Sequence, residues 1–252
     1  MARASHIYKC LAIGQNRSMN KDVRINKYLA ERGICSRRAA DQWVSDGRVK
    51  VNGIRAELGT KISEGDQVEV DGRLVEEPAE KLIYYAYHKP VGIMSSLDPK
   101  RKDTLLTAVT VPERVFPVGR LDVASQGLML LTNDGELSEA ITHPSREHEK
   151  EYVVTVDAPI SDEALEHMRR GVMVLGSPTK PAKIDRIGPS KFRIILTEGR
   201  NRQIRRMCET QGREVRKLVR VRIQTLELGE LEQGTWRKLT QDELNKLKGS
   251  IR

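Results

Sequence analysis

Residues 119–135 read GRLDVASQGLMLLTNDG. The apolar run Leu128–Leu131 is typical of a strand in a protein interior, and the NDG turn after it predicts the start of a helix. One acidic residue, Asp122, stands just before this run and two positions after Arg120. A charge beside a core strand costs free energy unless it is paired or used. We therefore expect a central strand here, and a carboxylate with either a cationic partner or a chemical function.

The overall composition favours a polyanionic partner. The 252 residues suffice for one or two domains, and with 38% apolar but only 4% aromatic residues the core should be aliphatic. Lys and Arg number 44 against 35 Asp and Glu, which gives a net charge of +9. Such an excess suits nucleic acid or an acidic membrane surface. The alternative is that the charge only keeps the protein soluble.

The cysteines and the apolar runs indicate an intracellular protein. Cys10, Cys35 and Cys208 are widely spaced and form no C-x-x-C pair, so neither a disulfide framework nor a zinc site is expected. No apolar run approaches the roughly 18 residues of a membrane span. We expect a cytoplasmic protein that contacts no membrane. Residues 1–20 are predicted to be a disordered tail, and the sequence does not decide whether Met19 is the true start.

Residues 21–72 have the pattern of a compact unit with two helices and a small sheet. Ser36 suits the N-cap of the second helix, and Asn52-Gly53 predicts a type I′ turn in a hairpin. A short charged linker, residues 73–81, follows. Basic residues gather around the second helix and the hairpin: Arg37, Arg38, Arg48 and Lys50.

Residues 82–246 have the pattern of a larger α+β domain. Strand patterns outnumber helical ones and do not alternate regularly with them, which favours a mostly antiparallel mixed sheet over a doubly wound parallel one. Ser161 and Gly171 bracket one predicted helix. The capping box Thr240-x-x-Glu243 predicts the start of the last helix.

Several chemistries lack their usual motifs. The sequence has no glycine-rich phosphate loop and no dinucleotide fingerprint, and its five histidines show no metal-ligand spacing. A metal-dependent nuclease would need a cluster of acids, whereas Asp122 stands nearly alone in its motif. We therefore expect neither a cofactor nor a metal.

A second basic concentration lies in residues 199–222, with nine Lys or Arg and two Glu. On a helix beginning near its start, arginines recur at three- and four-residue spacing next to apolar residues. Arg205 or Arg206 must then lie close to the apolar side, where an unpaired guanidinium is costly. Asp122 is a suitable carboxylate partner. The helix register alone does not choose between the two arginines.

The stretch RINKYLAERGICSRRAADQWVSDGRVKVNG, residues 24–53, resembles the αL RNA-binding module shared by a small-subunit ribosomal protein and bacterial tyrosyl-tRNA synthetases. The resemblance implies that the second helix and the hairpin present their basic side chains to RNA phosphates. Contacts of this kind position a protein on RNA without reading its sequence. The alternative is a solvated basic helix face.

Three further motifs follow this module in order: GRLDVASQGLMLLTNDG, KEYVVTV and EGRNRQIRRM. Together they resemble the RsuA-type pseudouridine synthases. HEKEYVVTV, PVGIMSS and TWRKLTQDEL are similar to the RluF-type branch of that family, which modifies large-subunit ribosomal RNA. Many members have Thr where this chain has Ser125.

The resemblance implies an isomerase that converts a specific uridine of ribosomal RNA to pseudouridine, with 23S rRNA of the large subunit as the first candidate. Asp122 would be the catalytic carboxylate, acting on either the anomeric carbon or the pyrimidine ring. Tyr152 would stack on the flipped-out base and help to remove the proton from carbon 5. Arg205 would pair with Asp122, and Arg120 would fill the gap left by the base.

Arg200 and Arg202 are expected to contact RNA as well, and the protein is expected to act as a monomer. Two alternatives remain open: a non-catalytic RNA-binding factor of ribosome assembly, and a synthase that acts on small-subunit ribosomal RNA or transfer RNA. The sequence does not identify the uridine that is modified, because target choice depends on RNA shape.

Overall fold

The computed structural model describes residues 22–75 and 81–251. The described residues form two compact units, residues 22–75 and 81–251, and each has a hydrophobic core of its own. The tail predicted for residues 1–20 and most of the predicted linker lie outside the described residues.

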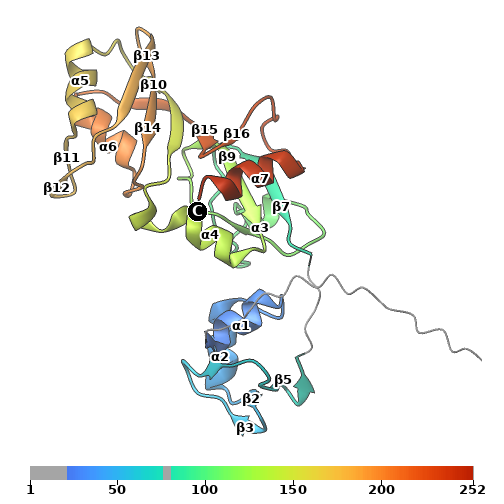
Figure 1. Ribbon diagram of the computed structural model, residues 1–252. Helices are drawn as coiled ribbons and strands as arrows, with labels where there is room; N and C mark the ends of the chain where they lie inside the picture. The colour runs from blue at the N-terminus through green and yellow to red at the C-terminus, as the bar shows by residue number, and fades with distance from the viewer. Residues whose placement is uncertain (1–21, 76–80, 252) are drawn as a thin grey trace, which may run out of the picture. The chain divides into compact units, whose positions relative to one another are not determined.

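The smaller unit, in its described residues, contains two helices and six short strands (Figure 1). The elements are β1 (Val23–Arg24), α1 (Ile25–Glu31), α2 (Arg37–Ser45), β2 (Val49–Val51), β3 (Ile54–Arg55), β4 (Lys61–Ile62), β5 (Val68–Val70) and β6 (Arg73–Leu74). Four of the strands form a sheet in the order β3-β2-β5-β6, and β1 pairs with β4.

Local sequence signals explain these elements. The Ser36 hydroxyl accepts a hydrogen bond from the Ala39 N–H at 3.1 Å, which caps α2 as predicted. Asn52 and Gly53 both have positive φ, as a type I′ turn between β2 and β3 requires. The predicted N-cap and hairpin turn are therefore confirmed.

The larger unit is built from strands and short helices in an irregular order (Figure 1). Its first half contains β7 (Tyr84–Lys89), α3 (Leu105–Ala108), β8 (Phe116–Pro117), β9 (Gln126–Thr132), α4 (Gly135–Thr142), η1 (Pro144–Arg146) and β10 (Lys150–Val156). Its second half contains α5 (Asp162–Arg170), β11 (Met173–Val174), β12 (Ser177–Pro178), β13 (Lys183–Gly188), β14 (Lys191–Leu196), α6 (Gln203–Glu209), β15 (Val215–Ile223), β16 (Leu226–Glu227), β17 (Trp236–Lys238) and α7 (Gln241–Gly249).

A nine-stranded sheet forms the frame of this unit. Its order is β13-β14-β10-β15-β9-β7-β17, with β16 beside β15 and β8 beside β9. The pairings in it are antiparallel except for β9 with β15. The buried run Leu128–Leu131 lies on β9, between β15 and β7. The predicted α+β fold with a mostly antiparallel mixed sheet is therefore confirmed.

Helices cover the sheet in two groups (Figure 1). α5 and α6 pack on β10, β13 and β14, where Leu165 and Met207 belong to one buried cluster. α4 and α7 pack against β7 and β9, where Leu137 and Leu247 belong to another. A third buried cluster, which contains Tyr85, Leu121 and Met129, also involves β7 and β9.

The predicted helix caps hold these helices in place. The Ser161 hydroxyl accepts from the Ala164 N–H at 3.1 Å at the start of α5, and Gly171 with φ of 104° ends that helix. Thr240 and Glu243 form the reciprocal capping box of α7. Each cap satisfies backbone groups that the first turn of a helix leaves without partners.

Two boundaries differ from those expected. Arg73–Leu74, placed in the linker by their charge, pair with β5, so the smaller unit extends past residue 72. Helix α7 continues to Gly249, and Leu247 and Ile251 are buried, so the larger unit extends past residue 246. Strand pairing and burial set these ends, and neither is visible in local composition.

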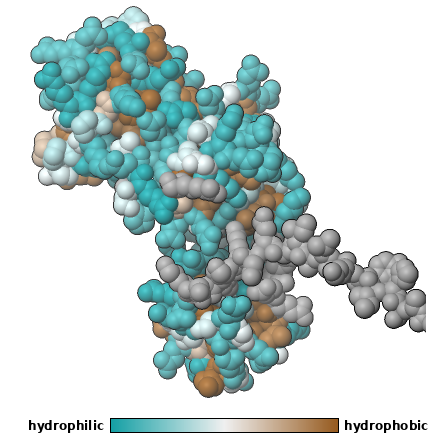
Figure 2. Space-filling view, viewed as in Figure 1, coloured by the Kyte–Doolittle hydropathy of each residue, from teal (hydrophilic) through white to brown (hydrophobic). Residues whose placement is uncertain are grey.

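Hydrophilic side chains dominate the visible surface of both units, and hydrophobic ones appear in small scattered groups (Figure 2). The most exposed large apolar side chains include Ile54, Met173 and Leu175, which lie on hairpins. Within residues 22–75 and 81–251, no helix is long and apolar enough to cross a membrane.

Gly127 lies where β9 meets β15. Its φ is +117°, and a Cβ added there would lie 2.3 Å from the backbone oxygen and 2.5 Å from the backbone nitrogen of Arg220. We predict that Gly127→Ala lowers the free energy of unfolding by about 2 kcal/mol or more, because the backbone of β15 would have to move. Urea denaturation followed by circular dichroism measures this change.

Gly229→Ala is the matched control. Gly229 also has positive φ, +56°, but a Cβ there would meet no atom within 4 Å. We expect this substitution to cost about 1 kcal/mol, which is the penalty for the backbone conformation alone. Equal losses at the two positions would show that the close approach of β15 is not what requires Gly127.

Candidate active site

Asp122 lies in the loop between β8 and β9, just before the central strand. Its side chain is half-buried, whereas the side chains of Val123 and Ala124 are exposed. The five consecutive backbone carbonyls from Arg120 to Ala124 all accept hydrogen bonds. One of them, the Asp122 carbonyl, accepts from the Ser125 N–H at 3.0 Å and closes a tight turn. The loop is therefore fixed on both sides of Asp122.

The segment that follows β7 supplies two of these contacts. The Gly92 N–H donates to the Val123 carbonyl at 2.9 Å. The Ser95 hydroxyl donates to the Leu121 carbonyl at 2.7 Å and accepts from the Leu121 N–H at 3.0 Å. Both residues that flank Asp122 are thus held by the same neighbouring segment.

Arg205 of α6 holds the far side of the loop. Its guanidinium donates to the Ala124 carbonyl at 2.7 Å and to the Val215 carbonyl at 2.9 Å, and the residue is only 8% exposed. Arg206 is half-buried instead, and its guanidinium contacts Asn201, which lies just before its own helix. The structure therefore selects Arg205 as the arginine that faces the loop.

The direct ion pair predicted between Arg205 and Asp122 is not formed in the part of the chain that the structure describes. The Arg205 guanidinium instead donates to the backbone carbonyls of Ala124 in the loop and of Val215 at the start of β15. Burial lowers the pKa of Arg205, the charge of Arg202 lowers it further, and the negative charge of Asp122 acts in the opposite direction. The carboxylate and the guanidinium thus interact through space without touching.

Arg220 of β15 could not be distinguished from its neighbouring arginines in the sequence. It is 3% exposed and donates to the Leu128 carbonyl at 2.7 Å and to the Arg120 carbonyl at 3.4 Å. One guanidinium nitrogen, Nη2, is buried without a partner in the described structure. Arg220 therefore connects the beginning of the Asp122 loop to the strand that follows it.

Lys89 lies at the end of β7. It is a further residue of the site, and the sequence alone did not identify it. It is fully buried, and its ammonium donates to the carbonyls of Pro90 at 2.8 Å and Ile93 at 2.7 Å. Burial lowers the pKa of Lys89 from 10.5 to about 8; the charge of Asp122 opposes this effect and that of Arg220 adds to it. Lys89 therefore anchors the segment after β7, the same segment that holds the two residues flanking Asp122.

Tyr152 lies on β10, half-buried between two hydrophobic clusters. One of these clusters contains Leu121, the residue before Asp122. The backbone of Tyr152 pairs with Arg220 on β15, which in turn pairs with Gly127 on β9. The sheet therefore brings Tyr152 to the region of the Asp122 loop, although the two lie far apart in the sequence.

The predicted RNA-contacting residues differ in their surroundings. Arg120 and Arg202 are exposed on the larger unit, and Arg37, Arg38 and Lys50 are exposed on the smaller one.

Arg48 is engaged within the smaller unit. Its guanidinium makes a bidentate contact with the Asp71 carboxylate at 2.9 and 2.5 Å and lies 4.7 Å from the centre of the Trp43 ring. These contacts raise the pKa of Arg48 and lower that of Asp71. Arg48 is therefore less free to contact phosphate than the exposed basic residues of α2.

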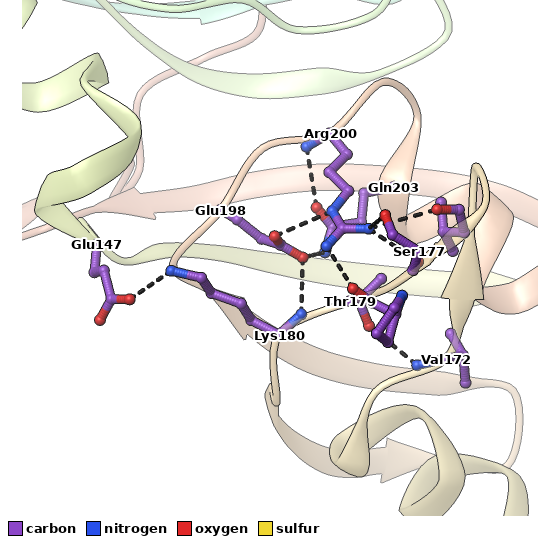
Figure 3. A network of polar contacts seen from close by, with 10 residues as sticks. Glu147, Val172, Ser177, Thr179, Lys180, Glu198, Arg200 and Gln203 are labelled. Atoms are coloured by element: carbon purple, nitrogen blue, oxygen red, sulfur yellow. Dashed lines mark hydrogen bonds and ion pairs between the residues drawn. The ribbon is translucent and has the colours of Figure 1, made fainter.

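Arg200 is engaged within the chain even more completely (Figure 3). Its guanidinium donates to the Glu198 carboxylate at 3.1 Å, to the Ser177 carbonyl and hydroxyl at 3.0 and 2.9 Å, and to the Pro178 carbonyl. Glu198 also accepts from the Gln203 side chain at 2.7 Å. These contacts, which tie the β11–β12 hairpin to the start of α6, argue against the RNA contact predicted for Arg200.

The site offers one half-buried carboxylate beside three buried cations, Lys89, Arg205 and Arg220. An ionised carboxylate that is held in one direction can act as a nucleophile. Among residues 22–75 and 81–251, no group of three or more His, Cys, Asp or Glu side chains could hold a metal ion.

Comparison with protein families finds two matches in this chain. Residues 23–68 match the S4 domain, and residues 83–210 match the RNA pseudouridylate synthase family. The second match contains Asp122, Tyr152 and Arg205.

Individual proteins agree with the family matches. The chain is 49% identical over 226 residues to the dual-specificity RNA pseudouridine synthase RluF of Escherichia coli O157:H7, covering 89% of this chain and 78% of that protein. It is 43% identical to the ribosomal large subunit pseudouridine synthase B of Xylella fastidiosa, covering 80% of this chain and 45% of that one. A crystal structure of a pseudouridylate synthase is 33% identical, with a TM-score of 0.66 over 89% of this chain and 99% of that chain.

These matches confirm the resemblance to the RsuA-type enzymes, to which the RluF and RluB relatives correspond. They also confirm the order of an RNA-binding S4 domain before the larger domain. The chain therefore belongs to the RNA pseudouridylate synthase family and is an RNA pseudouridine synthase.

Proposed function

We propose that this enzyme isomerises a uridine of ribosomal RNA to pseudouridine and that Asp122 is its catalytic carboxylate. The observation that carries the proposal is the half-buried Asp122 in a loop whose five carbonyls from Arg120 to Ala124 are all hydrogen-bonded. A reacting group held in one geometry avoids the entropic cost of being ordered in the transition state. The backbone around Asp122 meets this requirement before any RNA binds.

The reaction moves one bond within the nucleotide. The C1′–N1 bond of uridine breaks, the freed uracil turns, and a C1′–C5 bond forms. The proton on C5 is lost and N1 gains one, so the isomerisation is redox-neutral and requires no cofactor. Asp122 acts on either the anomeric carbon or the pyrimidine ring, and a carboxylate can serve as the nucleophile in both cases.

Tyr152 and two arginines complete the proposed site. A uridine in folded RNA must leave its stack, which costs a few kcal/mol, and the Tyr152 ring can offset part of this cost by stacking on the base. The Tyr152 hydroxyl helps to remove the proton from C5. Arg205 acts on Asp122 through the loop backbone and through its charge, and the exposed Arg120 occupies the space that the base leaves.

The names of two relatives support the substrate assignment. The Xylella fastidiosa relative is a ribosomal large subunit synthase, which supports large-subunit ribosomal RNA as the substrate here. The Escherichia coli relative is called a dual-specificity enzyme, which supports a second RNA substrate in addition. Small-subunit ribosomal RNA and transfer RNA are the candidates for it. Pseudouridines can be mapped in large-subunit ribosomal RNA, small-subunit ribosomal RNA and transfer RNA from cells with and without the gene. The RNAs that lose a pseudouridine when the gene is absent are the substrates.

We predict that Asp122→Asn abolishes pseudouridine formation while leaving RNA affinity within a few-fold of wild type. The amide keeps the size of the side chain but removes the negative charge that makes it a nucleophile. Tritium release from C5-labelled uridine in RNA measures the reaction, and filter binding measures the affinity. Asp185→Asn, at an exposed position on β13, is the matched control and should retain wild-type activity.

The same variant tests whether the cellular role of the enzyme depends on the isomerisation. A role in ribosome assembly that needs only RNA binding would persist when Asp122 is replaced. Retained isomerisation by Asp122→Asn would instead refute the assignment of Asp122.

We predict that the double variant Arg37→Ala, Arg38→Ala weakens RNA binding and lowers the slope of log affinity against log salt by about 1–2. Each phosphate contact releases counterions, so its loss reduces the salt dependence. The rate at saturating RNA should stay within about two-fold, because the residues lie on α2 of the smaller unit.

The double variant Lys61→Ala, Arg73→Ala is the matched control. It removes the same charge from exposed positions on β4 and β6 of the same unit. Equal losses of affinity in the two double variants would favour a general effect of net charge over a specific phosphate-binding face on α2.

A further inference from the structure

The Ser95 side chain makes two contacts with the backbone immediately before Asp122. Its hydroxyl donates to the Leu121 carbonyl at 2.7 Å and accepts from the Leu121 N–H at 3.0 Å. A hydroxyl has one proton to donate and lone pairs to accept with, so one oxygen can satisfy both groups. Leu121 is 7% exposed, which leaves its backbone groups little access to solvent.

These two bonds fix two successive peptide planes. The Leu121 N–H belongs to the plane that joins Arg120 to Leu121, and the Leu121 carbonyl belongs to the plane that joins Leu121 to Asp122. Because a peptide unit is rigid, the direction of the second plane determines where the Cα of Asp122 lies. The Asp122 carbonyl is fixed on the other side by the Ser125 N–H at 3.0 Å.

Ser95 can serve as a fixed point because its own neighbours are held. The Met94 N–H donates to the Asp103 carbonyl at 2.8 Å, and the Leu105 N–H, at the start of α3, donates to the Met94 carbonyl at 3.0 Å. The buried Lys89 ammonium closes the preceding turn through Ile93, at 2.7 Å. The backbone immediately before Ser95 is therefore anchored at Ile93 and Met94.

We propose that Ser95 is a positioning residue for Asp122, which its hydroxyl places by orienting the Leu121 peptide groups. This inference rests on the proposed function, since it requires Asp122 to be the reacting group. In this proposal Ser95 does not contact the substrate. Its effect on the reaction passes through the backbone alone.

Ser96 provides a matched control within the same segment. It is the adjacent serine, it is also half-buried, and its hydroxyl oxygen accepts a hydrogen bond from the Asp98 N–H at 3.1 Å. That bond closes a turn of its own and does not reach the Asp122 loop. Each alanine variant deletes one oxygen atom. Ser95→Ala removes the hydrogen bonds to the Leu121 backbone, whereas Ser96→Ala removes only the one from the Asp98 N–H.

The experiment measures single-turnover rate constants with enzyme in excess over ribosomal RNA at saturating concentration. We expect Ser95→Ala to lower this rate constant by about 10- to 100-fold, as a small misplacement of a reacting group does. RNA affinity should stay within about two-fold, and Ser96→Ala should react at the wild-type rate. Ser95→Thr keeps the hydroxyl and should recover most of the lost rate. Circular dichroism at the assay temperature verifies that each variant is fully folded.

Three results would overturn the proposal. The first is a rate constant for Ser95→Ala within two-fold of wild type. The second is an equal loss in Ser96→Ala, and the third is a loss in Ser95→Thr as large as that in Ser95→Ala. Each would show that the Ser95 hydroxyl does not act by placing Asp122.

Asp122→Asn, measured in parallel, separates this inference from the proposed function. If Asp122→Asn is inactive and Ser95→Ala reacts at the wild-type rate, only the positioning role fails. If Asp122→Asn itself forms pseudouridine, the assignment of Asp122 fails, and the role of Ser95 fails with it.

Discussion

The structure of the site depends on one constraint: the backbone carbonyls from Arg120 to Ala124 all accept hydrogen bonds from donors within the protein. Four of the five carbonyls from Arg120 to Ala124 accept from outside the tight turn, and their donors come from the segment after β7, from α6 and from β15. A buried carbonyl without a donor costs free energy comparable to a lost hydrogen bond. The loop can therefore adopt this geometry only when these elements have assembled around it. The site reaches its final geometry as the larger unit folds.

The same constraint explains why three cations are buried in the larger unit. Burying a charged side chain is costly unless its donors are satisfied. Lys89, Arg205 and Arg220 meet this condition in part, through backbone carbonyls, and in doing so they fix the segments on either side of Asp122. Arg205 Nε and Arg220 Nη2 are buried without a partner among the described residues. Their positive charge also favours an anionic ligand near the loop, which suits an RNA substrate.

The positive charge of the chain thus has two physical roles. Arg37, Arg38 and Lys50 on the smaller unit are exposed and free to meet phosphates, whereas Arg205 and Arg220 are turned inward. Composition counts both kinds alike, so the net charge of +9 indicates a polyanionic partner without indicating which residues touch it. Arg200 belongs to the second kind, because its donors are used within the β11–β12 hairpin and by Glu198.

The sequence by itself determined the features that rest on interactions over a few residues: the caps at Ser36, Ser161 and Thr240, and the turn at Asn52-Gly53. The motif around Asp122 and its family were also readable, because they are carried by contiguous stretches. Only the tertiary structure decided which backbone groups Ser95, Lys89 and Arg220 contact, and it replaced the expected ion pair of Arg205 with backbone contacts. The physical reason is separation: Arg220 contacts a carbonyl 100 positions away, and no local pattern specifies which distant backbone a buried side chain will meet.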